Sequence, residues 1–161
     1  MSIRAEESSQ SVAVKKLAQE LGAATMKGDN AKVIDYTYDT LVKAMGGREK
    51  AIEAVEAVMK QMKAQGITIK VFHAGDPGEF LTEGGNTFVV VPTRVEAVFS
   101  KGKVISKSYV LGISSDEGKT WKFADGSGII KQKELREKLL PKLPAKLKLP
   151  EREKPEIIPN N

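Results

Sequence analysis

The sequence predicts an α+β fold, in which three N-terminal helices pack on a curved antiparallel sheet, followed by a short C-terminal helix and an extended tail. Apolar residues recur with helical spacing up to residue 66 and then alternate with a period of two up to residue 125. A further helical segment ends at Pro141, and the leucines and prolines that follow favour an extended chain. Helices and strands that are segregated along the chain are typical of α+β folds.

Glycines mark the ends of the three expected helices at Gly28, Gly46-Gly47 and Gly66, where the left-handed conformation of a C-terminal cap favours this residue. The expected helices cover residues 12–27, 31–45 and 48–65. Each carries one apolar stripe. The stripes are Val14, Leu17, Ala18, Leu21 and Ala24/Thr25 in the first helix, Ile34, Tyr38, Leu41 and Met45 in the second, and Ala51, Ile52, Val55, Val58, Met59 and Met62 in the third.

Alternating apolar residues predict the strands of the sheet, and turn residues separate them. Pro92 falls inside the longest apolar segment, and because proline cannot donate to a strand ladder it predicts an edge or a bulge there. The expected strands cover residues 67–72, 79–82, 87–99, 103–114 and 119–125.

The chain divides into a flexible N-terminus (1–11), one domain (12–128) and a C-terminal part (129–161) with a helix over 130–140 and a basic tail. Five leucines of the tail would be exposed if it extended into solvent, so we expect them to cover an apolar surface as a strap. They are Leu139, Leu140, Leu143, Leu147 and Leu149.

Composition excludes several classes of site. The chain has 161 residues, no cysteine and one histidine, which excludes disulfides, thiolate sites and a multi-histidine metal centre within one chain. No phosphate-binding loop or other cofactor motif is present, so we expect no metal and no cofactor. No apolar run is long enough for a membrane span. The net charge is +5, mostly from residues 129–161, which lack aromatic residues, so nucleic-acid binding is not expected.

Short motifs around the second and third helices resemble those of the NTF2-like (cystatin-like cone) superfamily, in its SnoaL-like and uncharacterised branch. They are Gly28-Asp29, followed by Asp35, Tyr36 and Tyr38, and Gly46-Gly47-Arg48-Glu49, followed by Ala51-Ile52. The resemblance covers about residues 12–126. It implies an apolar pocket at the mouth of the cone and a homodimer formed through the outer face of the sheet. The superfamily contains both enzymes and non-catalytic binding domains, so it does not decide the function.

A second motif, Ser114-Ser115-Asp116-Glu117-Gly118-Lys119-Thr120-Trp121, is similar to the Asp-box of sialidases and other bacterial surface proteins. Its chemistry predicts a hairpin in which Asp116 accepts hydrogen bonds from turn amides, Gly118 has a positive φ and Trp121 packs beneath. We therefore interpret the motif as structural. Its occurrence in exported proteins favours an extracytoplasmic location. The sequence as given shows no signal peptide, and a cytoplasmic location stays open.

His73 is the candidate general base of an acid–base enzyme, because imidazole titrates near neutral pH. It follows Ile69 and Val71 by period two and would point into the pocket if that strand face lines the cone. Asp35 and Asp125 are the candidate acids.

Each candidate also has a structural interpretation. His73 lies at a strand end, Asp125 precedes Gly126 in a typical turn dipeptide, and Asp35 is placed for a surface ion pair with Arg48. Tyr38 either donates its hydroxyl into the pocket or belongs to the core. The expected pocket lining is Tyr38, His73, Tyr109, Trp121 and Phe123.

No complete catalytic constellation accompanies these residues, which favours a non-catalytic domain that binds a small apolar molecule or has a structural role. Two alternatives stay open. One is an isomerase- or dehydratase-like enzyme that uses His73 with Asp35 or Asp125. The other is a protein-interaction module that acts through the Leu/Pro/Lys tail.

Overall fold

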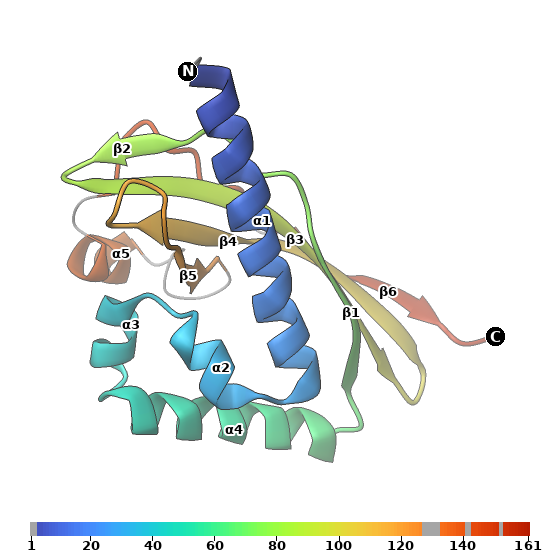
Figure 1. The fold of residues 1–161 in the computed structure, drawn as a ribbon. Helices are drawn as coiled ribbons and strands as arrows, with labels where there is room; N and C mark the ends of the chain where they lie inside the picture. Colours follow the sequence, from blue (N-terminus) through green and yellow to red (C-terminus); the bar gives the residue numbers. More distant parts are fainter. Residues whose placement is uncertain (1–2, 127–132, 141–142, 152) are drawn as a thin grey trace.

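The computed structural model describes residues 3–126, 133–140, 143–151 and 153–161. These residues form an α+β protein with an open antiparallel sheet, as the sequence predicts, and the sheet has six strands where the sequence predicts five. Two long strands, β3 (Asn86–Phe99) and β4 (Gly102–Ser114), form the centre of the sheet and pair along their whole length. Figure 1 shows the long N-terminal helix on one side of these strands and the C-terminal segments on the other.

Two short strands share each outer edge of this central pair. The outer edge of β3 pairs with β2 (Leu81–Glu83) near the start of β3 and with β1 (Thr68–Ala74) further along it. Along β4, the pairing passes from β5 (Lys122–Asp125) to β6 (Glu156–Pro159). Pro92 lies in β3 between the segments paired with β2 and β1, and its carbonyl accepts a hydrogen bond from Gly75. This gap is a local edge, so the missing N–H of Pro92 costs no ladder bond.

Helix α1 (Ile3–Lys27) packs on one face of the sheet and along the free edge of β1. Val14 and Ala18 are fully buried in a cluster with residues of β3, β4 and β5. The side-chain amide of Gln19 donates to the carbonyl of Phe72 (2.7 Å) and accepts from the N–H of Ala74 (2.9 Å). Gln19 therefore acts as a substitute for the missing neighbouring strand and protects this edge.

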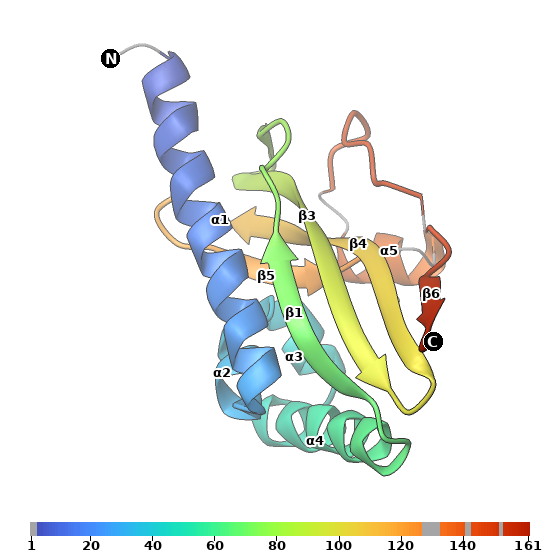
Figure 2. The same cartoon turned by 90° about the vertical axis from the view of Figure 1, so that its right-hand side faces the viewer.

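The opposite face of the sheet is covered by the C-terminal part of the chain (Figure 2). Phe88, Tyr109, Leu111 and Ile113 form a second buried cluster there, together with Leu41 of α3 (Asp39–Ala44). Four tail leucines pack against it, which confirms the expected strap for these residues; they are Leu140, Leu143, Leu147 and Leu149. We call the described residues 143–151 the strap. The side chain of Leu139 lies outside the described residues.

The expected second helix is wrong in one respect, because the structure divides it into α2 (Asn30–Asp35) and α3. Strand β5 causes the break: Phe123 donates its N–H to the carbonyl of Tyr36 and accepts from the N–H of Tyr38. Residues 36–38 are thereby drawn into a bridge with β5 and leave the helical conformation. The third helix is confirmed as α4 (Arg48–Ala64), followed by Gly66 with a positive φ.

The ends of the chain hold more regular structure than the sequence indicates. Helix α1 begins at Ile3 instead of residue 12, because residues 3–11 contain no glycine or proline to stop it. The C-terminal helix α5 (Lys133–Leu139) lies within the expected 130–140. Strand β6 was not expected, because its four exposed residues show neither alternation nor a long apolar run.

Candidate functional site

The turn at 114–121 has the geometry that its motif predicts. Asp116 accepts hydrogen bonds from the N–H and the hydroxyl of Thr120 (2.8 and 2.6 Å) and from the hydroxyl of Ser114 (2.8 Å). These bonds, led by that from Thr120, lower the pKa of Asp116 to about 2. Gly118 has φ +87°, and Trp121 is buried. Each hydrogen bond of Asp116 named above is internal to the turn, so the motif holds the hairpin together, as we expected.

His73 is exposed and does not share a face with Ile69, contrary to the expected period of two. A bulge between Ile69 and Val71 shifts the register of β1 against β3 by one residue. Such a shift exchanges the two faces of a strand. Phe72 consequently packs against α1 at Gly22, while His73 lines a hollow on the opposite face of the sheet, beside Arg94.

Asp35 forms the surface ion pair that its position suggested. The carboxylate accepts from Nε and Nη2 of Arg48 (3.0 and 3.3 Å), and both side chains are 56% exposed. The hydrogen bond from Arg48 lowers the pKa of Asp35. The pair joins α2 to the first turn of α4, and its carboxylate stays ionised at neutral pH.

Asp125 lies exposed at the end of β5 and contributes to raising the pKa of Tyr109. His73 is on β1, and the order β1-β3-β4-β5 puts three strand spacings between the two residues. That separation is about 14 Å. A general base must be within hydrogen-bond reach of its partner or of a shared substrate atom. The structure therefore does not bring His73 together with Asp125. Asp35 is paired with Arg48 instead.

The five residues expected to line one pocket are divided between three places. Trp121 and Phe123 are buried on the α1 face, and Phe80 packs edge-on against Trp121 with a centroid distance of 5.8 Å. Tyr38 and Tyr109 belong to the cluster under the strap. His73 lies in neither cluster. The expectation of a single pocket failed for two reasons. Tyr109 of β4 faces the strap whereas Trp121 and Phe123 face α1, and the bulge in β1 turns His73 away from the α1 face.

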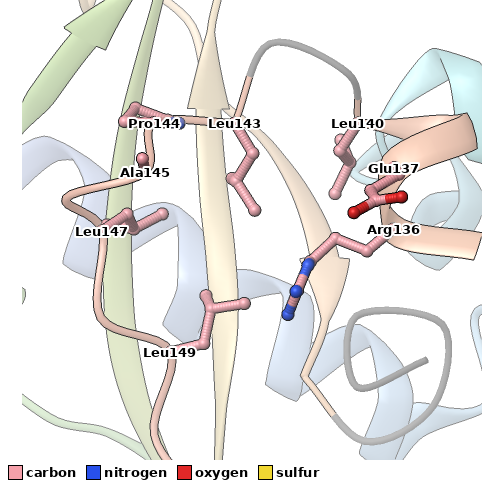
Figure 3. A pocket seen from close by; sticks show the side chains of 8 residues that line it. All are labelled: Arg136, Glu137, Leu140, Leu143, Pro144, Ala145, Leu147 and Leu149. Atoms are coloured by element: carbon pink, nitrogen blue, oxygen red, sulfur yellow. The ribbon is translucent and has the colours of Figure 1, made fainter. Parts of the chain in front are cut away.

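A hollow of about 450 Å³ lies between α5 and the strap (Figure 3). Its volume is within the range of small-molecule sites, roughly 300–1,000 Å³. Four leucines from the strap and the end of α5 provide the apolar lining, and two charged residues of α5 provide the polar lining. The lining residues are Arg136, Glu137, Leu140, Leu143, Pro144, Ala145, Leu147 and Leu149.

Arg136 is the cation of this hollow. Its guanidinium extends from α5 toward Leu149, whereas the carboxylate of Glu137 lies nearer Leu140 (Figure 3). Glu137 is exposed and makes no ion pair with Arg136. Arg136 is close enough to Tyr109 to oppose the rise in its pKa.

Tyr109 is the buried polar group nearest to this arrangement. It is 2% exposed, and its hydroxyl has no hydrogen-bond partner among the described residues. Burial is the main cause that raises its pKa to about 12, so the hydroxyl stays protonated at neutral pH. Sequence reasoning placed Tyr109 in a pocket wall but missed Arg136, because nothing local to α5 indicates which surface it packs against.

Two further hollows of about 340 Å³ each border the strap. One contains His73, Arg94 and Lys107 on the sheet, faced by Glu151 and Glu153 from the C-terminal segment. The other lies at the gap between β1 and β2, next to Lys146 and Lys148. The strap therefore borders all three hollows.

The described residues include no group of three or more acidic or histidine side chains arranged to hold a metal ion. Among the helices that the structure describes, none is both long and apolar enough to cross a membrane. Comparison with models of known protein families, with characterised proteins and with solved structures finds no match to this chain.

Proposed function

We propose that this chain is a non-catalytic binding domain that takes up a small apolar molecule between α5 and the strap. The observation that carries the proposal is the hollow of about 450 Å³, where four leucines and two charged side chains of α5 meet beside a buried apolar cluster. Leucine side chains around a concave site favour apolar ligands, since each square ångström of apolar surface removed from water contributes about 25 cal/mol.

The position of the acid–base candidates supports a binding function rather than catalysis. His73 shares its hollow with Arg94 and Lys107 and with two glutamates of the C-terminal segment, but with neither expected acid: Asp35 pairs with Arg48, and Asp125 lies three strand spacings away. The leucines of the strap pack on the chain's own sheet, so they are not displayed to a partner protein. Both alternatives from the sequence are therefore less favoured than ligand binding.

We also propose that the fold is a divergent NTF2-like fold and that two copies pair through the sheet. The order of helices before a long antiparallel sheet supports the first point, as does the start of α4 directly after Gly46-Gly47. Val71 on the outer face of the sheet is an apolar side chain that is 37% exposed, which supports the pairing of two copies. Sedimentation equilibrium would show a mass of one chain if the pairing is absent.

A neutral fluorescent probe tests the binding proposal. N-phenyl-1-naphthylamine brightens in apolar surroundings and carries no charge that would favour a basic patch. Leu149→Asn puts a polar group into the hollow, and Ile157→Asn makes the same kind of change on β6, where Ile157 is 64% exposed and outside the hollow. We expect L149N to weaken probe binding about tenfold and I157N to leave it unchanged. Equal affinity in both variants, or no probe binding by the native chain, would refute the proposal.

A further inference from the structure

We infer that the molecule bound under the strap is an amphipathic carboxylate, with an alkyl chain on the leucines and an ionised carboxyl head on Arg136. This inference rests on the proposed function and adds the chemical class of the ligand. It begins from the composition of the hollow, which combines four leucines with one arginine and one glutamate.

Charge complementarity selects an anionic head. Arg136 projects its guanidinium into the hollow from α5, and no ion pair to Glu137 neutralises it. A guanidinium presents parallel N–H donors that match the two oxygens of a carboxylate. Glu137, its neighbour on α5, would repel an anion, but its carboxylate lies nearer Leu140, whereas the guanidinium extends toward Leu149, and Glu137 is exposed.

Tyr109 is a buried polar group in the cluster under the strap and is not among the lining residues of the hollow. A buried hydroxyl without a partner is costly, and native structures rarely leave one. The hydroxyl of Tyr109 has no partner among the described residues, and Arg136 acts electrostatically on the same group. Arg136 is therefore near a buried donor, although Tyr109 does not itself line the hollow.

The arrangement of the leucines selects the remainder of the ligand. Leu143, Leu147 and Leu149 line the hollow along the strap while packing against the sheet cluster. Aromatic side chains are not among its described lining residues, which gives no stacking surface for a planar ligand. A flexible alkyl chain fits such an aliphatic lining better than a ring system.

The test uses the whole chain and three ligands of equal length, namely decanoate, 1-decanol and decylamine, by isothermal titration calorimetry at neutral pH. We expect decanoate to bind about tenfold more tightly than decanol, as a charge-assisted hydrogen bond implies, and decylamine to bind most weakly. Arg136→Gln should remove the preference for decanoate and keep the affinity for decanol. Lys138→Gln is the matched control, because Lys138 is an exposed cation on the same helix that does not line the hollow.

The outcomes separate the inference from the proposed function. If decanoate and decanol bind equally and R136Q changes neither affinity, the anionic class is wrong while apolar binding stands. If R136Q and K138Q reduce decanoate binding equally, the preference comes from net charge and the role of Arg136 is overturned. If no ligand of the series binds and the neutral probe does not bind either, the proposed function fails with it. Equal melting temperatures of the two variants show that each comparison is made on folded protein.

Discussion

Replacement of Gln19 by methionine tests how the free edge of β1 is protected. Methionine has nearly the length of glutamine and keeps the packing of α1, but it can neither donate to the carbonyl of Phe72 nor accept from the N–H of Ala74. Ala74 is fully buried, so no solvent molecule replaces the lost acceptor, whereas Phe72 is only partly buried. An unsatisfied buried backbone group costs about 1–3 kcal/mol.

Together the two lost bonds should lower the free energy of unfolding by about 2–4 kcal/mol. A loss of about 3 kcal/mol corresponds to a fall in Tm of about 6–12 °C for a chain of this size. Urea denaturation followed by circular dichroism measures the change. Gln61→Met, at an exposed position of α4, is the control and should change stability by less than about 0.5 kcal/mol. Equal effects of Q19M and Q61M would show that the edge does not depend on the Gln19 amide.

Three further substitutions test other parts of the structure. In Gly22→Ala the new Cβ would lie 1.9 Å from Cδ1 of Phe72, so we expect thermal melting to show a loss of about 2 kcal/mol despite the gain in helix propensity; a Tm at or above the native value would contradict the packing of α1 on β1. Because the pKa of Asp116 is lowered to about 2, its contribution to stability is present above pH 4 and lost between pH 4 and pH 2; Asp116→Asn should therefore be less stable at neutral pH and lose less stability across that interval, and parallel pH curves would contradict this. Tyr109→Phe removes a buried hydroxyl that has no partner among the described residues, so chemical denaturation should show equal or higher stability, and a loss above about 1 kcal/mol would indicate an unrecognised partner.

Local sequence signals predicted those elements whose boundaries are set locally. Helix α4 lies between Gly47 and Gly66, both with positive φ, and its predicted range agrees with the structure to within one residue. The turn at 114–121 forms through hydrogen bonds within eight residues, so its geometry also follows from the motif.

Long-range contacts account for the failures. The break between α2 and α3 comes from backbone hydrogen bonds to Phe123, some 85 residues further along the chain. No local pattern marks the bulge after Ile69, yet it reverses the side of the sheet on which His73 lies. The candidate site failed for this reason, since its members were assigned to one face by an uninterrupted period of two.

The strap was predicted by a different kind of argument. Five exposed leucines would be unfavourable in water, and the structure packs four of them on the sheet. That argument shows that the tail must cover something, but not where it lies. The hollow beside Arg136 depends on the place where α5 and the strap meet, which no local property of either segment specifies.

Methyl NMR of the chain labelled at leucine and valine tests most directly whether the strap closes a ligand site over the sheet. The structure predicts nuclear Overhauser effects from the methyl groups of Leu143, Leu147 and Leu149 to the aromatic protons of Phe88 and Tyr109. It also predicts that decanoate shifts these leucine signals while those of Val14 and Val89, on the α1 face, stay in place. Strap leucines with random-coil shifts and no such effects, or ligand-induced shifts confined to the α1 face, would contradict the proposed site.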